Sequence, residues 1–115
     1  MLTPDFEFQD ARGKLLQLVH SGYTQVNIIM TNQGVIRGGH YHKKSREAFY
    51  IISGSVDVTV KNRNENETEH FSEGTFFEID QFTIHTMSFP ESCIMVALYD
   101  VPIEMENGEK DIWPA

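Results

Sequence analysis

The sequence contains one cysteine, few basic residues and no long apolar run. Cys93 alone cannot form a disulfide framework, so a reducing, cytoplasmic setting is expected. Nine basic against 17 acidic residues give a formal charge of −8. This charge disfavours nucleic acid and anionic membrane as partners, because both require a basic surface. No stretch approaches the ~18 apolar residues of a spanning helix, and the first residues have no signal-peptide pattern.

The chain of 115 residues, 40% of them apolar, fits one soluble globular domain that spans residues 1–115. Cys93 alternates with Met95 and Ala97, so we expect it to pack in the interior rather than to act as a nucleophile. No long stretch has a convincing helical period, and an all-β domain is therefore the expected class.

Short segments rich in β-branched and aromatic residues are separated by turn signals along the chain. Residues 55–60 alternate between apolar and polar side chains, as expected for a strand with one buried face. The polar segment 61–67 is expected to be an exposed hairpin loop. The predicted strands are 25–30, 47–52, 55–60, 76–79, 83–89 and 92–99. Many short strands at this spacing indicate a sandwich or barrel.

A pattern typical of metal sites lies in the middle of the chain. His40 and His42 are two residues apart, so on an extended strand their side chains point to one face. Glu47 follows after a short polar break, and a third histidine, His85, comes much later. Three imidazoles and a carboxylate are ligands suited to Zn, Ni, Mn, Fe or Cu, and the pattern does not choose among these metals.

The side-chain parity of two predicted strands supports a common interior for these residues. If Glu47 faces inward, Phe49 and Ile51 face inward with it, and Met87 likewise accompanies His85. An unpaired carboxylate in such an apolar interior is costly. A metal ion or a partner histidine would relieve that cost.

The spacing resembles the cupin superfamily, whose first motif is matched at Gly34, His40, His42, Glu47 and Gly54. The second cupin motif begins here at Gly74 and reaches its histidine at His85. The resemblance implies a single-domain β-barrel, the double-stranded β-helix or jelly roll. It also implies that His40, His42, Glu47 and His85 bind a divalent transition metal inside the barrel.

The chain departs from the cupin pattern just before and after its last histidine. Cupins usually have proline and glycine where this chain has Asp80 and Phe82, and asparagine where it has Phe89. Two of the three departures lie in the turn before His85, whereas all four ligand positions are kept.

The front half of the chain is similar to deoxysugar-nucleotide 3,5-epimerases and ketoisomerases, which act on dTDP- or UDP-linked 4-keto sugars. The likeness lies in Asp10–Gly13, Gln25–Asn27 and Gly34–His40. It implies that His40 removes a proton next to the ketone and that Arg12 and Arg37 contact phosphate or the site. His42, a position usually held by glutamine in the epimerases, is closer to the ketoisomerases and to the small metal-binding cupin domain fused to capsular-sugar reductases.

The two resemblances give His40 competing roles. A ligated imidazole has no lone pair left to accept a proton, so His40 can bind the metal or act as a free base but hardly both. The ligand spacing favours the metal role. Arg37 has the opposite strand parity to His40, although Gly38 and Gly39 permit a bulge that could bring both into one site. A structural ion pair is the alternative for Arg37.

Two further segments carry weaker signals. Arg12 with Gly13 is expected to form a turn before a strand, with a phosphate contact as the alternative. The acidic run 104–111 is expected to be a solvated tail, whereas residues 112–114 are expected to dock on the barrel or across a dimer. A free edge strand and the dimers common among such cupins favour a homodimer.

Three classes of function follow from this set of residues. The first is metal-assisted isomerisation or epimerisation of a small carbonyl or sugar-type substrate, with a keto sugar nucleotide as the leading candidate and His40 and Arg37 as catalytic residues. The second is a metal-dependent dioxygenase. The third is a module that binds a small molecule without turning it over.

Overall fold

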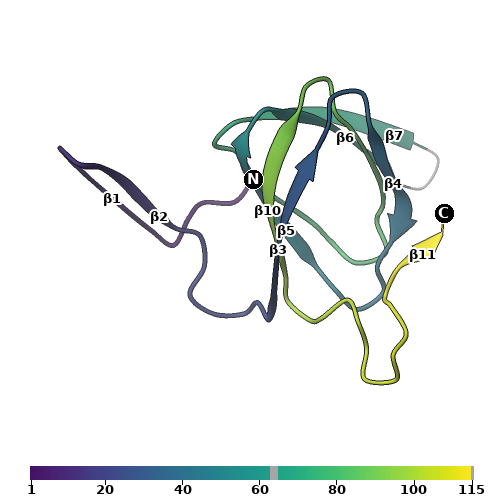
Figure 1. Cartoon of the computed structure of the whole chain (residues 1–115). Coiled ribbons are helices and arrows are strands. Elements are labelled where there is room, and N and C mark those ends of the chain that lie inside the picture. Colours follow the sequence, from purple (N-terminus) through teal and green to yellow (C-terminus); the bar gives the residue numbers. More distant parts are fainter. Residues whose placement is uncertain (63–64, 115) are drawn as a thin grey trace.

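The computed structural model describes residues 1–62 and 65–114, which form a barrel and a separate hairpin (Figure 1). These residues contain no helix, and thus none long and apolar enough to cross a membrane. The strands are β1 Phe6–Asp10, β2 Gly13–Gln17, β3 Gln25–Thr31, β4 Ile36–Tyr41, β5 Glu47–Ser53, β6 Ser55–Asn62, β7 Glu65–Ser72, β8 Phe76–Ile79, β9 Ile84–Ser88, β10 Cys93–Tyr99 and β11 Trp113–Pro114. The all-β prediction is confirmed.

Two antiparallel sheets build the barrel. One has the strand order β3-β10-β5-β8, and the other has the order β11-β4-β9-β6-β7. Strands far apart in the sequence are therefore neighbours: β4 lies between β9 and the C-terminal strand β11 (Figure 1). This topology brings the segment that contains His40 and His42 next to the segment that contains His85.

The six predicted strands are present with their ends shifted by a few residues at most. The prediction of a loop over residues 61–67 is wrong at both ends, because β6 continues through Asn62 and β7 begins at Glu65; residues 63 and 64 lie outside the described part of the chain. β7 was missed because nearly all its side chains are polar and exposed. Its pairing with β6 along the whole strand compensates for that poor strand propensity.

The core lies between the two sheets. Phe49 and Ile51 are 3% and 0% exposed, which confirms the inward parity predicted for them. The Phe71 and Phe77 rings stack with centroids 4.1 Å apart, and Phe49 stacks on Phe77 at 5.3 Å. Full burial of each such side chain contributes about 1.5–3 kcal/mol. Cys93 belongs to this core, and burial raises the pKa of its thiol, in agreement with a packing role.

The β1–β2 hairpin, which the sequence analysis did not predict, projects away from the barrel (Figure 1). Its tip is the turn expected at Arg12 and Gly13; the Arg12 guanidinium pairs with Asp10 at 2.6 Å, and Gly13 has a φ of 139°. Arg12 therefore lies on the projecting arm and not in the barrel interior.

Candidate metal centre and active-site cleft

A β-bulge in β4 sets the position of His40. The register between β4 and β9 shifts between Gly38 and His40, after which His40 is paired with His85. Gly38 has a φ of 110°, and a Cβ at this position would lie 2.6 Å from the carbonyl oxygen of His85. Glycine is therefore required for the close approach of the two strands.

The three histidines converge inside the barrel. His40, His42 and His85 each offer a ring nitrogen, and these nitrogens all lie within 4.8 Å of one another. His42 and His85 are both 3% exposed, whereas His40 is half-buried. The sequence analysis placed these residues in one site, and the structure brings them together.

Glu47 completes the cluster from the first position of β5. Its carboxylate is buried, with 4% of the residue exposed. Oε1 contacts Nε2 of His42, and Oε2 lies 3.7 Å from Nε2 of His85. Glu47 thus adjoins two of the three converging histidines, near the place where β4, β5 and β9 meet.

The hydrogen bonds of two histidines determine which ring nitrogen holds the proton. His42 Nδ1 lies 2.5 Å from the backbone carbonyl of Asp111, and His85 Nδ1 lies 3.1 Å from that of Thr83. A carbonyl oxygen only accepts, so both Nδ1 atoms donate and both Nε2 atoms carry a lone pair in the neutral ring. Each lone pair is directed toward Glu47.

His42 Nε2 provides the test of whether a metal fits. This atom is buried, and among the described residues it has no partner in hydrogen-bond geometry, although it contacts the Glu47 carboxylate. A lone pair beside an ionised carboxylate is repulsive unless a proton or a cation lies between them. A divalent ion bound by both atoms would remove the repulsion, and His40 and His85 supply two more donors. The residues present therefore fit a first-row divalent metal.

The pKa values within the cluster separate the histidines. Burial lowers the pKa of His40, and charge on His85 or His42 lowers it further. Burial is also the main reason that the pKa of His85 is lowered. Burial would lower the pKa of His42 too, but the interactions of His42 with Glu47 and Asp111 together outweigh burial and raise it. Without a metal, a proton taken up by the cluster therefore binds first to His42.

Arg37 shares a small cavity with the cluster. The cavity, of about 170 Å³, is also lined by His40, Glu47 and His85. In a regular strand Arg37 and His40 would face opposite sides. The bulge at Gly38 and Gly39 changes the register, so that both residues line this cavity. Among residues 1–62 and 65–114 no carboxylate pairs with Arg37, whose Nε donates to the Thr31 hydroxyl at 2.9 Å.

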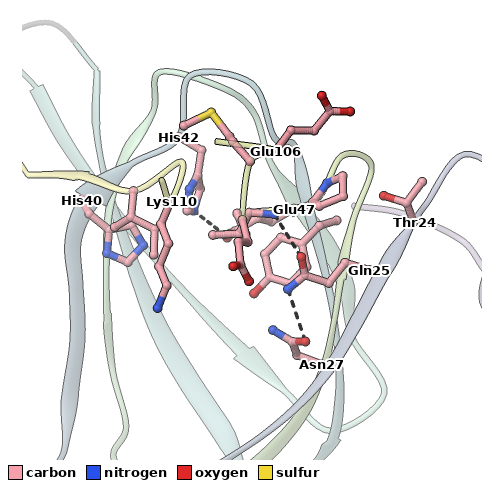
Figure 2. Close-up of a pocket in the computed structure, with 14 residues that line it drawn as sticks. Thr24, Gln25, Asn27, His40, His42, Glu47, Glu106 and Lys110 are labelled. Atoms are coloured by element: carbon pink, nitrogen blue, oxygen red, sulfur yellow. Dashed lines mark hydrogen bonds and ion pairs between the residues drawn. The ribbon is translucent and has the colours of Figure 1, made fainter. Parts of the chain in front are cut away.

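A cleft of about 800 Å³ opens from the cluster to solvent. Figure 2 shows Glu47 in its centre, with His40 and His42 on one side and Gln25 and Asn27 on the other. Tyr99 also lines the cleft, and burial, followed by the charge on Glu47, raises the pKa of its hydroxyl to about 12. The hydroxyl is therefore protonated at neutral pH and can donate a hydrogen bond to a ligand.

The C-terminal segment forms the other wall of the cleft. The prediction of a solvated tail at 104–111 holds for residues 104 and 106–110, which are exposed, but it is wrong for Asp111. Asp111 is only 1% exposed, and its N–H donates to the carbonyl of Ile103 at 2.7 Å. Glu104, Glu106 and Lys110 line the cleft. The sequence did not indicate the burial of Asp111, because the backbone N–H groups that its carboxylate binds, those of residues 43–45, are distant in the sequence. Trp113 pairs with Tyr41 in the sheet, so the prediction that this end docks on the barrel is confirmed.

The turn before His85 contains the departure from the cupin pattern. Phe82 occupies the position where cupins usually have glycine, and its φ of 60° lies in the left-handed region. Its ring is 66% exposed, and its N–H donates to the carbonyl of His42 at 2.7 Å. The glycine-like backbone is therefore kept without glycine, and His85 still reaches the cluster.

A jelly-roll barrel with three histidines and a glutamate in its interior is the cupin fold, and solved structures with that fold resemble this chain. The sugar 3,4-ketoisomerase QdtA of Thermoanaerobacterium thermosaccharolyticum, solved with TDP, is 20% identical with a TM-score of 0.74 over 85% of this chain and 77% of that one. A 3,4-ketoisomerase of Helicobacter canadensis is 18% identical with a TM-score of 0.76 over 91% and 84%.

A longer protein contains the same fold as one part. The capsular polysaccharide assembling protein CapF of Staphylococcus aureus is 16% identical with a TM-score of 0.67, over 95% of this chain and 32% of that protein. No curated protein matches the sequence. Residues 8–92 match the polysaccharide biosynthesis C-terminal domain, and the chain belongs to that family.

Proposed function

We propose that this protein is a metal-dependent cupin that isomerises or epimerises a keto sugar, with a nucleotide-linked 4-keto sugar as the first candidate substrate. The observation that carries the proposal is the buried Nε2 lone pair of His42 beside the Glu47 carboxylate, at the bottom of a cleft. Such a pair needs a proton or a cation between its two atoms, and a metal cation at that point would meet any ligand that enters the cleft.

His42, Glu47 and His85 would hold the metal, with His40 as the fourth ligand. A bound divalent ion would act as a Lewis acid on a carbonyl oxygen and so acidify the adjacent C–H bond, whose proton would pass to water in the open cleft while His40 is a ligand. The backbone carbonyls of Asp111 and Thr83 keep the Nε2 lone pairs of His42 and His85 directed inward.

Two other side chains suit the charge that develops on the substrate. Arg37 lines the small cavity beside the histidines and would stabilise negative charge on an enolate-like oxygen. The Tyr99 hydroxyl, protonated at neutral pH, would donate a hydrogen bond to the same substrate. Both groups belong to rigid strands, which reduces the reorganisation needed when charge forms.

The rest of the cleft favours an uncharged polyhydroxy group near the metal. Gln25 and Asn27 offer amides on one wall, and these side chains suit sugar hydroxyls. The opposite wall has Glu104 and Glu106 against one cation, Lys110. A diphosphate is thus best accommodated outside the cleft mouth, with the keto sugar inside.

The test is an isomerisation assay of metal-loaded protein with a TDP-linked 4-keto-6-deoxy sugar, followed by proton exchange with deuterated water at the carbons beside the ketone. The expected result is product or exchange that is lost in His40→Ala and after chelation. Exchange that survives chelation but not His40→Ala would indicate a free-base mechanism. No exchange at any metal, with tight metal binding, would favour a binding module, and oxygen uptake with Fe(II) would favour the dioxygenase.

We also propose a homodimer, formed through the outer face of the β3 sheet. Val26, Ile28 and Met30 are 62%, 62% and 70% exposed there, although the outer face of such a sheet is ordinarily polar. The projecting hairpin adds Phe6, Phe8 and Leu15, each about half exposed. Together these residues expose on the order of 700 Å², close to the ~800 Å² that each partner buries in a standard interface.

Sedimentation equilibrium tests the dimer. Wild type should sediment with twice the chain mass, and Ile28→Glu should shift it to the monomer, because the variant would bury a charge in the interface. A monomeric wild type at micromolar concentration would contradict the dimer.

A further inference from the structure

Asp111 is a buried carboxylate, and no cationic side chain within residues 1–62 and 65–114 forms an ion pair with it. It accepts hydrogen bonds from the backbone N–H groups of Lys43, Lys44 and Ser45 at 2.9, 2.8 and 2.9 Å. The indole N–H of Trp113 donates a fourth bond at 2.9 Å. These N–H groups outweigh the effect of burial and hold the pKa of the carboxyl at about 2, so the group is an anion at neutral pH.

The loop that Asp111 binds is the connection between two members of the histidine cluster. Residues 43–46 join His42, which directly follows β4, to Glu47 at the start of β5. Three consecutive N–H groups held by one carboxylate fix the path of this connection. The distance between His42 and Glu47 therefore depends on a side chain far along the sequence.

Asp111 also acts on His42 through its backbone. Its carbonyl accepts the Nδ1–H of His42, which leaves the Nε2 lone pair directed at Glu47. The strand that follows reinforces this contact, because Trp113 is paired with Tyr41 and Pro114 with His40. The same segment thus contacts both His40, which is in β4, and His42, which follows it.

We infer that Asp111 is a positioning residue of the metal centre: through its carboxylate and its carbonyl together, it fixes His42 and Glu47 in the geometry that binds the ion. The effect of Asp111 on metal binding rests on the proposed function. Its effect on the positions of His42 and Glu47 applies to the metal-free protein as well. The C-terminal segment is then a component of the site and more than a wall of the cleft.

The test compares Asp111→Asn with the matched control Asp100→Asn. The asparagine places an NH₂ group where N–H donors already point, so the loop has to move. Asp100 accepts hydrogen bonds from the N–H groups of Arg46 and Val101 at 2.7 and 2.8 Å, at the other end of the same connection. Asp100 is only partly buried and has no hydrogen bond with His42 among the described residues, so its variant controls for the loss of a carboxylate that anchors the same loop.

Two readouts separate positioning from general stability. The first is the zinc dissociation constant, which we expect to weaken about 10- to 100-fold in Asp111→Asn and less than about threefold in Asp100→Asn. The second is the ¹⁵N NMR spectrum of the metal-free protein, in which His42 should lose its fixed Nδ1–H tautomer only in Asp111→Asn.

Each result of these experiments either supports the positioning role of Asp111 or contradicts it. Equal losses of thermal stability in the two variants, with zinc affinity and the His42 tautomer unchanged, would overturn it. If wild type binds no zinc, the proposed function fails, and the tautomer still decides whether Asp111 positions His42. If Asp111→Asn does not fold, Trp113→Phe is the second variant, because it removes one hydrogen-bond donor to the Asp111 carboxylate. Its zinc dissociation constant should weaken about two- to fivefold, and the Nδ1–H tautomer of His42 should become less populated. No change in either readout would overturn the inference.

Discussion

The two ends of the barrel interior are built on the same strands but have opposite chemistry. On β5 the inward residues run from Glu47 to Phe49 and Ile51, and on β9 from His85 to Met87. The apolar end contributes stability through burial and stacking. The histidine end buries a carboxylate and two histidines, which is costly without a cation. The apolar end therefore stabilises the barrel interior, whereas the histidine end, without a cation, destabilises it.

The largest expected effect is on binding, at the histidine end. Glu47→Gln removes the carboxylate charge and keeps the shape of the side chain. Metal affinity should fall on the order of 10³-fold, or about 4 kcal/mol. Loss of the charged ligand itself should weaken binding more than loss of a hydrogen-bond partner of a ligand, which typically weakens it about 10- to 100-fold. Titration calorimetry with Zn²⁺ measures it. The metal-free variant should be at least as stable as wild type in urea, and a large loss of stability there would contradict the comparison.

A change at the apolar end should have the converse result. Met87→Ala leaves a cavity in the apolar core, next to the small cavity that Arg37 shares with the histidines, and we expect the free energy of unfolding to fall by about 3 kcal/mol. Urea denaturation measures this value. Zinc affinity should stay within about threefold of wild type, because Met87 donates nothing to the ion. A comparable loss of affinity would show that the two ends are not independent.

The pH dependence should distinguish the histidines within one end. The pKa of His42 is raised above 6.5, so its contribution to the stability of the metal-free protein is fully present below pH 6.5 and is lost as pH rises through the raised value. His40 and His85 have lowered pKa values because the fold favours their neutral forms. Their contribution to the stability of the fold is therefore present above pH 6.5 and is lost as pH falls below 6.5. Metal-free stability should therefore be greatest near pH 6.5.

Metal affinity should follow the proton on His42. Zinc has to displace that proton, so affinity should rise as pH increases through the raised pKa of His42. Met87→Ala should show the same pH profiles as wild type, with its stability lowered throughout. A zinc affinity independent of pH from 6 to 8 would contradict the raised pKa.

The smallest effect concerns the turn that leads to the histidine end. Phe82→Gly relieves a left-handed backbone that costs a non-glycine residue about 1–2 kcal/mol, while glycine adds about 0.5–1 kcal/mol of unfolded-state entropy. The expected net gain is about 0.5 kcal/mol in urea denaturation, with zinc affinity unchanged. A measurable loss of stability would mean that the exposed ring packs against Tyr41 strongly enough to offset the strain.

The parts of the site that follow local rules could be predicted from the sequence. The period of two along β5 placed Glu47 inward beside Phe49, and the His40–His42 spacing placed two rings in one site. The parity of Arg37 could not be read reliably, because the bulge depends on how closely β4 approaches β9. The burial of Asp111 was missed because its partners, 66 to 68 residues earlier in the chain, meet it only in the folded barrel.

The central claim is that the histidine end holds a metal ion, and metal content combined with chelation tests it most directly. Protein purified without chelator or affinity metal should contain close to one equivalent of a first-row divalent metal by elemental analysis. EDTA should then lower its free energy of unfolding by about 2.7 kcal/mol when free metal had been present at 100 times the dissociation constant. No metal at stoichiometric level, together with unchanged stability after EDTA, would contradict the claim and leave His40 as a free base.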